Sequence, residues 1–129
     1  MPGTRSQAKN VIDAAQGYSN AAVTAAQILS EFVSTSFGRI SGIKFYAVTA
    51  GTGGASTVCD VLLNGTSVWS TAANRPTLLA TSTGEFTNSV PDPGSRGIRP
   101  GDRLTLQVNT VSSTGHARVM GTVAIEANA

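Results

Sequence analysis

The chain has 129 residues, of which 40% are hydrophobic and 12% charged, and its formal net charge is +2 at pH 7. This length and apolar share suit one domain with a single core and favour a folded chain over a disordered one. The basic residues are scattered and no run of 18 apolar residues occurs, so we expect neither a nucleic-acid partner nor a membrane span.

Residues 1–20 are polar, with weak periodicity and without the apolar segment of a signal peptide. They are expected to form an N-terminal arm, extended or partly helical around residues 8–16, that either docks on a neighbour or frays. Residues 21–37 fit a helical stripe as well as a strand, and the β-prone residues 33–37 favour a first strand within residues 27–37. The predicted domain division is therefore an arm over residues 1–20 and a β-sandwich domain over residues 21–129.

Strand signals become clearer from residue 39 onward. Residues 39–48 are β-prone, and Gly42 inside them indicates a bulge. Asn64-Gly65 predicts a type I′ hairpin that joins a strand over residues 56–63 to one over residues 66–70. Residues 77–80 and 85–90 are expected to form short strands, residues 91–97 are rich in turn formers, and Pro100-Gly101 predicts a tight turn.

Two alternating segments close the chain, one over residues 103–109 and one over residues 118–126. Seven or eight short strands with closely spaced turns predict an all-β protein, an antiparallel β-sandwich or jelly roll. The expected core consists of large apolar residues on the inward faces: Phe45, Val61, Leu63, Trp69, Leu104, Leu106, Val108, Val123 and Ile125.

Few residues suggest chemistry. Cys59 is the only cysteine, so no intrachain disulfide can form, and its apolar neighbours predict a small buried hydrophobic side chain. His116 is expected in a turn or on the surface, and Asp60, in the middle of a strand, is expected to be exposed or hydrogen-bonded to backbone. One histidine and one cysteine give little basis for a metal site, and we expect no cofactor and no catalytic residue.

Residues 60–69 (DVLLNGTSVW) carry an apolar strand with an aspartate into an Asn-Gly-Thr hairpin. Residues 74–77 (NRPT) follow, and residues 100–108 (PGDRLTLQV) open a strand with a Gly-Asp turn. In this order and spacing, the three strings resemble a β-sandwich module of the virion surface proteins of tailed bacteriophages. The resemblance covers roughly residues 39–125 and leaves the first 38 residues outside.

The resemblance implies a structural role on the virion and contributes no catalytic residue. A short chain without a repetitive shaft fits a capsid decoration (cement) protein, which would bind the major capsid protein on the outer surface of the head. The resemblance further suggests a homotrimer, made in the host bacterial cytoplasm and located on the capsid surface, with no nucleic-acid or membrane partner.

Two other classes of function stay open at this point. The first is a tail-fibre or head-fibre adhesin that binds host-surface carbohydrate, for which Tyr18 and Tyr46 are the candidate aromatic platforms. The second is an enzyme, but none of its candidate acids forms a spaced pair with a recognisable role. These acids are Asp13, Glu31, Asp60, Glu85, Asp92, Asp102 and Glu126.

Overall fold

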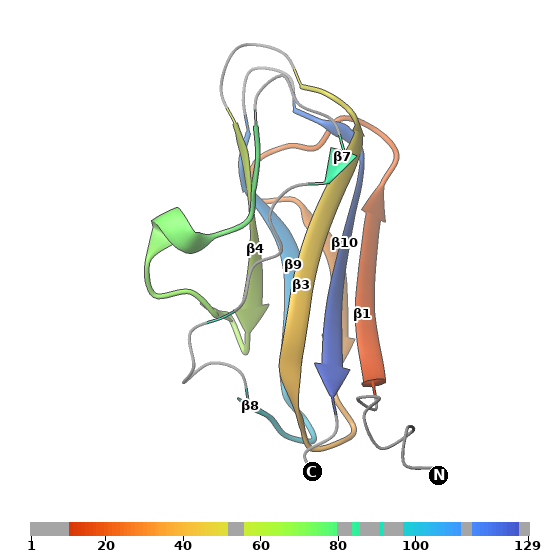
Figure 1. Cartoon of the computed structure of the whole chain (residues 1–129), viewed down its shortest axis with the longest axis vertical. Helices are drawn as coiled ribbons and strands as arrows, with labels where there is room; N and C mark the ends of the chain where they lie inside the picture. Colours follow the sequence, from red (N-terminus) through yellow and green to blue (C-terminus); the bar gives the residue numbers. More distant parts are fainter. Residues whose placement is uncertain are drawn as a thin grey trace, which may run out of the picture.

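The computed structural model describes residues 11–51, 56–79, 84–85, 91, 97–111 and 115–126. Within these ranges, ten strands form two antiparallel sheets that pack against each other (Figure 1). Sheet A contains β1 (Val11–Ser19), β10 (Ala117–Glu126) and β3 (Gly38–Thr49) in that order, and the short β7 (Gly84–Glu85) and β8 (Gly97–Ile98) both pair with β3. Sheet B contains β2 (Ile28–Val33), β9 (Arg103–Thr110) and β4 (Thr57–Leu63), and β5 (Thr66–Ser67) and β6 (Thr77–Leu78) both pair with β4.

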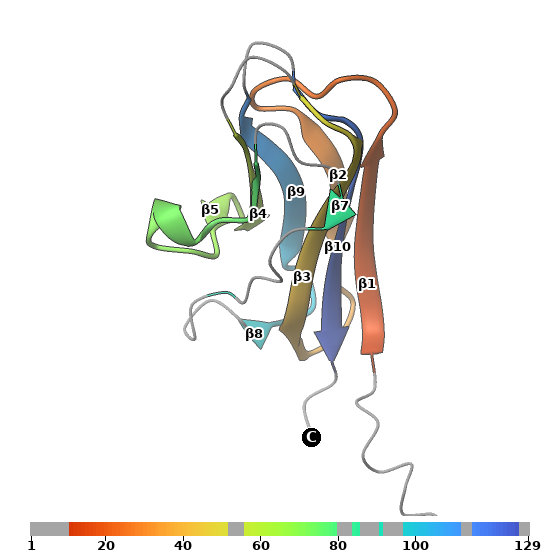
Figure 2. The same ribbon diagram turned by 45° about the horizontal axis from the view of Figure 1, so that its top comes forward.

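The chain passes repeatedly from one sheet to the other, with β1, β3, β7, β8 and β10 in sheet A and the other strands in sheet B. If β5 and β6 are taken as one interrupted strand, and β7 and β8 as another, each sheet has four strands in the arrangement of a jelly roll. The predicted all-β, antiparallel sandwich is confirmed. A short 3-10 helix, η2 (Ala72–Asn74), follows β5 and projects to one side of sheet B (Figure 2).

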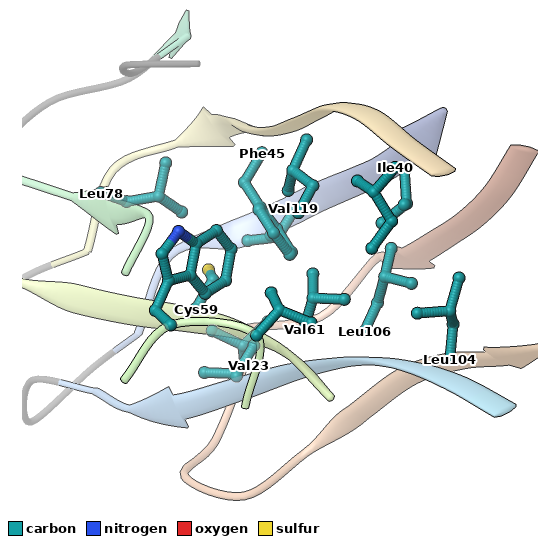
Figure 3. Close-up of a cluster of buried hydrophobic side chains, with 14 of the residues drawn as sticks. Val23, Ile40, Phe45, Cys59, Val61, Leu78, Leu104, Leu106 and Val119 are labelled. Carbon is teal, nitrogen blue, oxygen red and sulfur yellow. The ribbon is translucent and has the colours of Figure 1, made fainter. Parts of the chain in front are cut away.

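Alternation along the long strands places the core between the sheets (Figure 3). On β10, for example, Val119, Val123 and Ile125 are buried, whereas Met120 and Thr122 between them are exposed. The predicted core is confirmed except at Leu63, which is half-buried and packs against the cluster from its margin. The buried cluster comprises Val23, Ile40, Ile43, Phe45, Ala47, Cys59, Val61, Val68, Trp69, Leu78, Ile98, Leu104, Leu106, Val108, Val119, Val123 and Ile125.

The turns follow the sequence closely. Asn64 and Gly65 have φ of 53° and 89°, as a type I′ hairpin requires. The register between β3 and β10 shifts next to Gly42, where a bulge was expected. Gly101 has φ of 93°, and the Asp102 amide donates to the Arg99 carbonyl at 3.0 Å, which closes the predicted turn.

The structure differs from the sequence prediction at the N-terminus. Val11–Ser19 is strand β1 of sheet A, in register with β10 from Val11 opposite Glu126 to Ser19 opposite Val119. The sandwich therefore includes residues that were assigned to the arm, and this part of the chain is neither free nor helical. The pairing involves residues about a hundred positions apart, and the segment's own small and polar residues show no alternation that would reveal it. Residues 1–10 lie outside the described residues.

The first strand expected within residues 27–37 is present as β2, and residues 77–80 contain β6. Of the strand expected over residues 85–90, only Glu85 lies within the described part of the chain, where it belongs to β7. In the part of the chain that the structure describes, no helix is long and apolar enough to span a membrane.

Candidate functional site

His116 is fully buried, so the prediction of a turn or surface position was wrong for its side chain. Its Nε2 lies 2.9 Å from the carbonyl oxygen of Leu79, and its Nδ1 lies 2.9 Å from the hydroxyl of Thr57. A carbonyl only accepts, so Nε2 donates, and in the neutral ring Nδ1 accepts from Thr57. The His116 carbonyl also accepts from the Val23 amide at 2.8 Å. His116 lies directly before β10 and thus links three other segments: the β1–β2 connection, β4 and the residue after β6. This is a structural role.

Asp60 is also buried, although it lies on the outward side of β4 between the inward Cys59 and Val61. One carboxylate oxygen accepts from the Val61 amide at 2.8 Å and from the Ser67 hydroxyl at 2.7 Å. The other oxygen lies 3.4 Å from Nε of Arg75. The predicted backbone hydrogen bond is confirmed, and the alternative of an exposed carboxylate is not.

The surroundings of Asp60 have opposing effects on its charge. Burial raises the pKa of Asp60, while the Ser67 hydroxyl, the Arg75 guanidinium and the Val61 amide counteract this rise. Nε of Arg75 makes an ion pair but no hydrogen bond among the described residues. Ser67 precedes η2 and Arg75 follows it, so the contacts of Asp60 fasten both sides of the segment between β4 and β6 to β4.

Cys59 lies in the core beside Asp60, as predicted for a small apolar side chain. Burial raises the pKa of the Cys59 thiol to about 12, and the neighbouring Asp60 carboxylate adds to this effect. The free thiol is therefore protonated at neutral pH, which is unfavourable for a nucleophile.

The other candidate acids are dispersed. Glu31 on β2 accepts from the Thr105 hydroxyl at 3.1 Å and lies 3.7 Å from Nε of Arg103. Glu126 at the end of β10 lies 3.9 Å from Nε of Arg39. The described residues contain no group of three histidine, cysteine or acidic side chains that could hold a metal ion. Of the remaining candidates, Asp13 belongs to β1 and Glu85 to β7, and the structure describes only their backbone. Asp92 lies outside the described residues.

Asp102 fixes one end of the sandwich. Its carboxylate accepts from the Asn64 side-chain amide at 3.1 Å and from the Arg99 backbone amide at 2.9 Å. The bond from Asn64, and after it the bond from Arg99, hold the pKa of Asp102 below its usual value. The Asp102 carbonyl accepts from the Ser34 amide at 2.8 Å, and the Ser34 carbonyl accepts from the Gly101 amide at 2.8 Å. Three connections, β2–β3, β4–β5 and β8–β9, are therefore tied together.

Two large apolar side chains are exposed at this same end. Phe37 is 62% exposed and Val33 is 58% exposed, on either side of the connection between β2 and β3. Arg103 is the register partner of Val33, Arg39 follows Phe37 by two positions, and Arg99 belongs to the turn. We call these five residues the Phe37 end. Sequence reasoning assigned Phe37 to a strand and missed its exposure, because only the turn from sheet B to sheet A brings it to the surface.

The outer face of sheet A carries a second exposed group. Tyr18, Met120 and Tyr46 are register partners across β1, β10 and β3, and they are 51%, 37% and 40% exposed. Both tyrosines that were candidate platforms are thus on the surface, and they share one face. The Tyr18 hydroxyl donates to Oδ1 of Asn20 at 3.1 Å, which restrains the ring.

A cleft of about 460 Å³ lies along the β1–β10 pair next to Tyr18. Its lining consists of three consecutive residues from each strand and one residue from β2: Gln16, Gly17, Tyr18, Met120, Gly121, Thr122 and Leu29. Tyr46 is not part of this lining, although it belongs to the same row of side chains.

The molecule therefore presents two exposed surfaces of different chemistry. The Phe37 end has two exposed apolar side chains and three arginines, of which Arg39 and Arg103 form ion pairs with Glu126 and Glu31, and the cleft combines an aromatic ring with neutral polar groups. No protein-family model matches the chain, and no curated protein or solved structure matches it either.

Proposed function

We propose that the protein is a structural protein of a tailed-bacteriophage virion, a decoration protein that binds the major capsid protein on the outer surface of the head. The motif order in residues 60–69, 74–77 and 100–108 supports this proposal, as does the jelly-roll strand order, which is common among viral capsid proteins. Since fold alone does not fix function, the observation that carries the proposal is the exposed Phe37 end.

The composition of the Phe37 end is that of a protein–protein contact. Aromatic and arginine side chains are enriched in such contacts and supply most of their binding energy. Burying the exposed part of Phe37 is worth about 1–2 kcal/mol from the apolar area alone. The hydrogen bonds of Asp102 and Ser34 fix the backbone beforehand, so that little ordering entropy is lost on binding.

The first strand of the sandwich begins, and the last strand ends, near the Phe37 end. Val11 at the start of β1 is the register partner of Glu126, and Glu126 is the partner of Arg39 (Figure 1). Residues 1–10 precede β1 at this end of the sandwich, which makes them candidates for the same capsid contact. In a homotrimer, each single contact can be modest, because the second and third contacts become intramolecular.

The test is co-sedimentation of the purified protein with capsids that lack it. Phe37→Asp is expected to weaken binding at least about tenfold, which corresponds to about 1.4 kcal/mol per copy. Leu79→Asp is the matched control, because Leu79 is also 62% exposed but follows β6 at the opposite end, where Thr57 pairs with Leu78. Both substitutions are at exposed positions and should leave the melting temperature nearly unchanged. Equal capsid binding by wild type and Phe37→Asp would refute the proposal.

A second variant tests the arm. Deletion of residues 1–10 is expected to leave the sandwich folded and to weaken capsid binding. Deletion of residues 1–20 would also remove β1 and expose the edge of β10, so loss of binding by that variant would not identify a contact. Light scattering of the wild type supplies the oligomeric state, and a strict monomer at all concentrations would count against the trimer.

The adhesin is a second candidate function, and one observation favours it. Tyr18 is exposed, restrained by its bond to Asn20 and placed at the wall of a cleft. This feature lies on the face of sheet A, away from the turns of the Phe37 end, so the two functions are compatible and can be tested separately.

A further inference from the structure

We propose that the cleft along the β1–β10 pair binds a neutral saccharide, with Tyr18 as the platform for one sugar ring. The inference gives the adhesin candidate a site and a ligand class, and it does not depend on the capsid contact at the Phe37 end.

The floor of the cleft is formed where two glycines face each other. Gly17 and Gly121 are register partners, and both are buried positions that point toward sheet B. A Cβ on Gly17 would lie 2.7 Å from Cβ of Leu29, and one on Gly121 would lie 2.6 Å from Cε2 of Phe45. The missing side chains let the core pack closely against the inner side of this backbone. On the outer side, the backbone of the glycine pair forms the floor between the flanking side chains, and Leu29 also belongs to the lining.

The walls are two rows of outward side chains on either side of this glycine pair. Tyr18 and Met120 form one register pair, and Gln16 and Thr122 form the other. Residues two positions apart along a strand are separated by about 7 Å, which is enough for a six-membered ring to lie between the rows. One wall is thus aromatic and thioether, and the other offers an amide and a hydroxyl.

These walls match the two sides of a sugar. The C–H groups of a pyranose form an apolar patch that can lie on the Tyr18 ring, while its hydroxyls can exchange hydrogen bonds with the Gln16 amide and the Thr122 hydroxyl. The bond from the Tyr18 hydroxyl to Asn20 holds the platform in place before the ligand arrives, which reduces the entropy lost on binding.

Charge selects among the possible ligands. The seven lining residues include no carboxylate and no cationic side chain, although the exposed Lys44 is the register partner of Thr122 one strand further on, outside the lining. Within the lining an ionic ligand would lose water without gaining a counter-ion, whereas an uncharged polyhydroxylated ligand would lose less and regain hydrogen bonds. The volume of about 460 Å³ falls in the usual range for small-molecule sites.

The cleft is open at the surface, so we expect a single-site Kd of about 1 mM, or about −4 kcal/mol. An oligomer would convert several such contacts into useful avidity for a polysaccharide.

The experiment is a titration of the isotopically labelled full chain, followed by backbone amide NMR. The probes are methyl α-mannopyranoside, methyl β-galactopyranoside and N-acetylglucosamine, each to about 20 mM, well above the expected Kd. At least one probe should shift the amides of residues 16–18 and 120–122. Tyr18→Ala should raise its Kd at least about fivefold, and Gln16→Leu, which keeps the size of the side chain but removes the amide, should also weaken binding.

Tyr46→Ala is the matched control, because it removes the same side chain from the same face and row but leaves the cleft lining intact. It should bind the probe as the wild type does. Absence of shifts with all three probes, or equal losses in the Tyr18 and Tyr46 variants, would overturn the inference. So would concentration-dependent shifts of the same amides without sugar, which would assign this face to a second copy of the chain. Tyr18→Ala should still sediment with capsids, so failure here leaves the decoration proposal untouched.

Discussion

Replacing Asp60 by alanine should destabilise the fold by about 3 kcal/mol, whereas replacement by asparagine should cost less than about 1 kcal/mol. Alanine leaves the Val61 amide and the Ser67 hydroxyl without their acceptor at 2.8 and 2.7 Å, and each lost bond to a charged group is worth about 1.5–3 kcal/mol. Relief from burying a charge offsets part of this sum. Asparagine keeps an acceptor oxygen at the same place and removes only the ion pair with Arg75.

Urea unfolding followed by the fluorescence of Trp69, which is buried and is the only tryptophan, measures both variants. With a slope of about 2 kcal/mol per molar urea, a loss of about 3 kcal/mol lowers the midpoint by about 1.5 M. If Asp60→Asn lowers the free energy of unfolding as much as Asp60→Ala does, then the charge and not the hydrogen-bond acceptor holds the segment between β4 and β6. That result would refute the prediction. Two variants that are both as stable as wild type would show that the contact contributes nothing.

The stabilities of wild type and Asp60→Asn should also differ in their dependence on pH. Because burial raises the pKa of Asp60 in the folded state, the folded protein holds this proton more strongly than the unfolded chain does. The contribution of Asp60 to stability is therefore complete below its unfolded pKa, near 3.8, and is lost as pH rises through the folded pKa. Asp60→Asn should accordingly gain stability relative to wild type as pH rises through this window, and a gain in the opposite direction would contradict the burial argument.

Three further predictions concern other parts of the fold. Gly65→Val should lower the free energy of unfolding by about 2 kcal/mol, because φ is 89° there, and an unchanged melting temperature would disprove the turn. His116→Leu should cost about 2 kcal/mol in urea unfolding, because the buried Thr57 hydroxyl and the half-buried Leu79 carbonyl lose their bonds to the ring, and a neutral result would remove its structural role. The lowered pKa of Asp102 should contribute stability above its unfolded pKa that disappears as pH falls through the folded value. Asn64→Ala should weaken this acid-side dependence, and a carboxyl titration of Asp102 that stays unchanged would contradict it.

The sequence predicted those parts of the fold in which local chemistry and the final structure agree. Leu104, Leu106 and Val108 alternate with polar residues, and this period of two correctly indicates a strand with one face on a core. Asn64-Gly65 likewise determines its turn locally, because positive φ at both positions is a property of the two residues themselves.

Long-range partners could not be predicted in the same way. β1 is a strand because β10 lies beside it, and the small residues of β1 carry little preference of their own. The burial of His116 depends on Thr57 and Leu79, which are separated from it by 59 and 37 positions. The cleft likewise depends on which residues of β1 stand opposite which residues of β10. Its aromatic member, Tyr18, was a candidate from the sequence, but Gln16, Met120 and Thr122 were not.

The start of β1 and the end of β10 meet at a single tip, where Val11 stands opposite Glu126. A fluorescent protein or affinity tag joined close to Val11 or Glu126 would consequently crowd the tip proposed to face the capsid, and is expected to weaken attachment. The exposed turn at Ala25 and Ala26 lies within the β1–β2 connection, at the far tip. Cargo inserted at that turn would lie at the tip opposite the proposed capsid contact, which makes it the better position for a label or a displayed peptide.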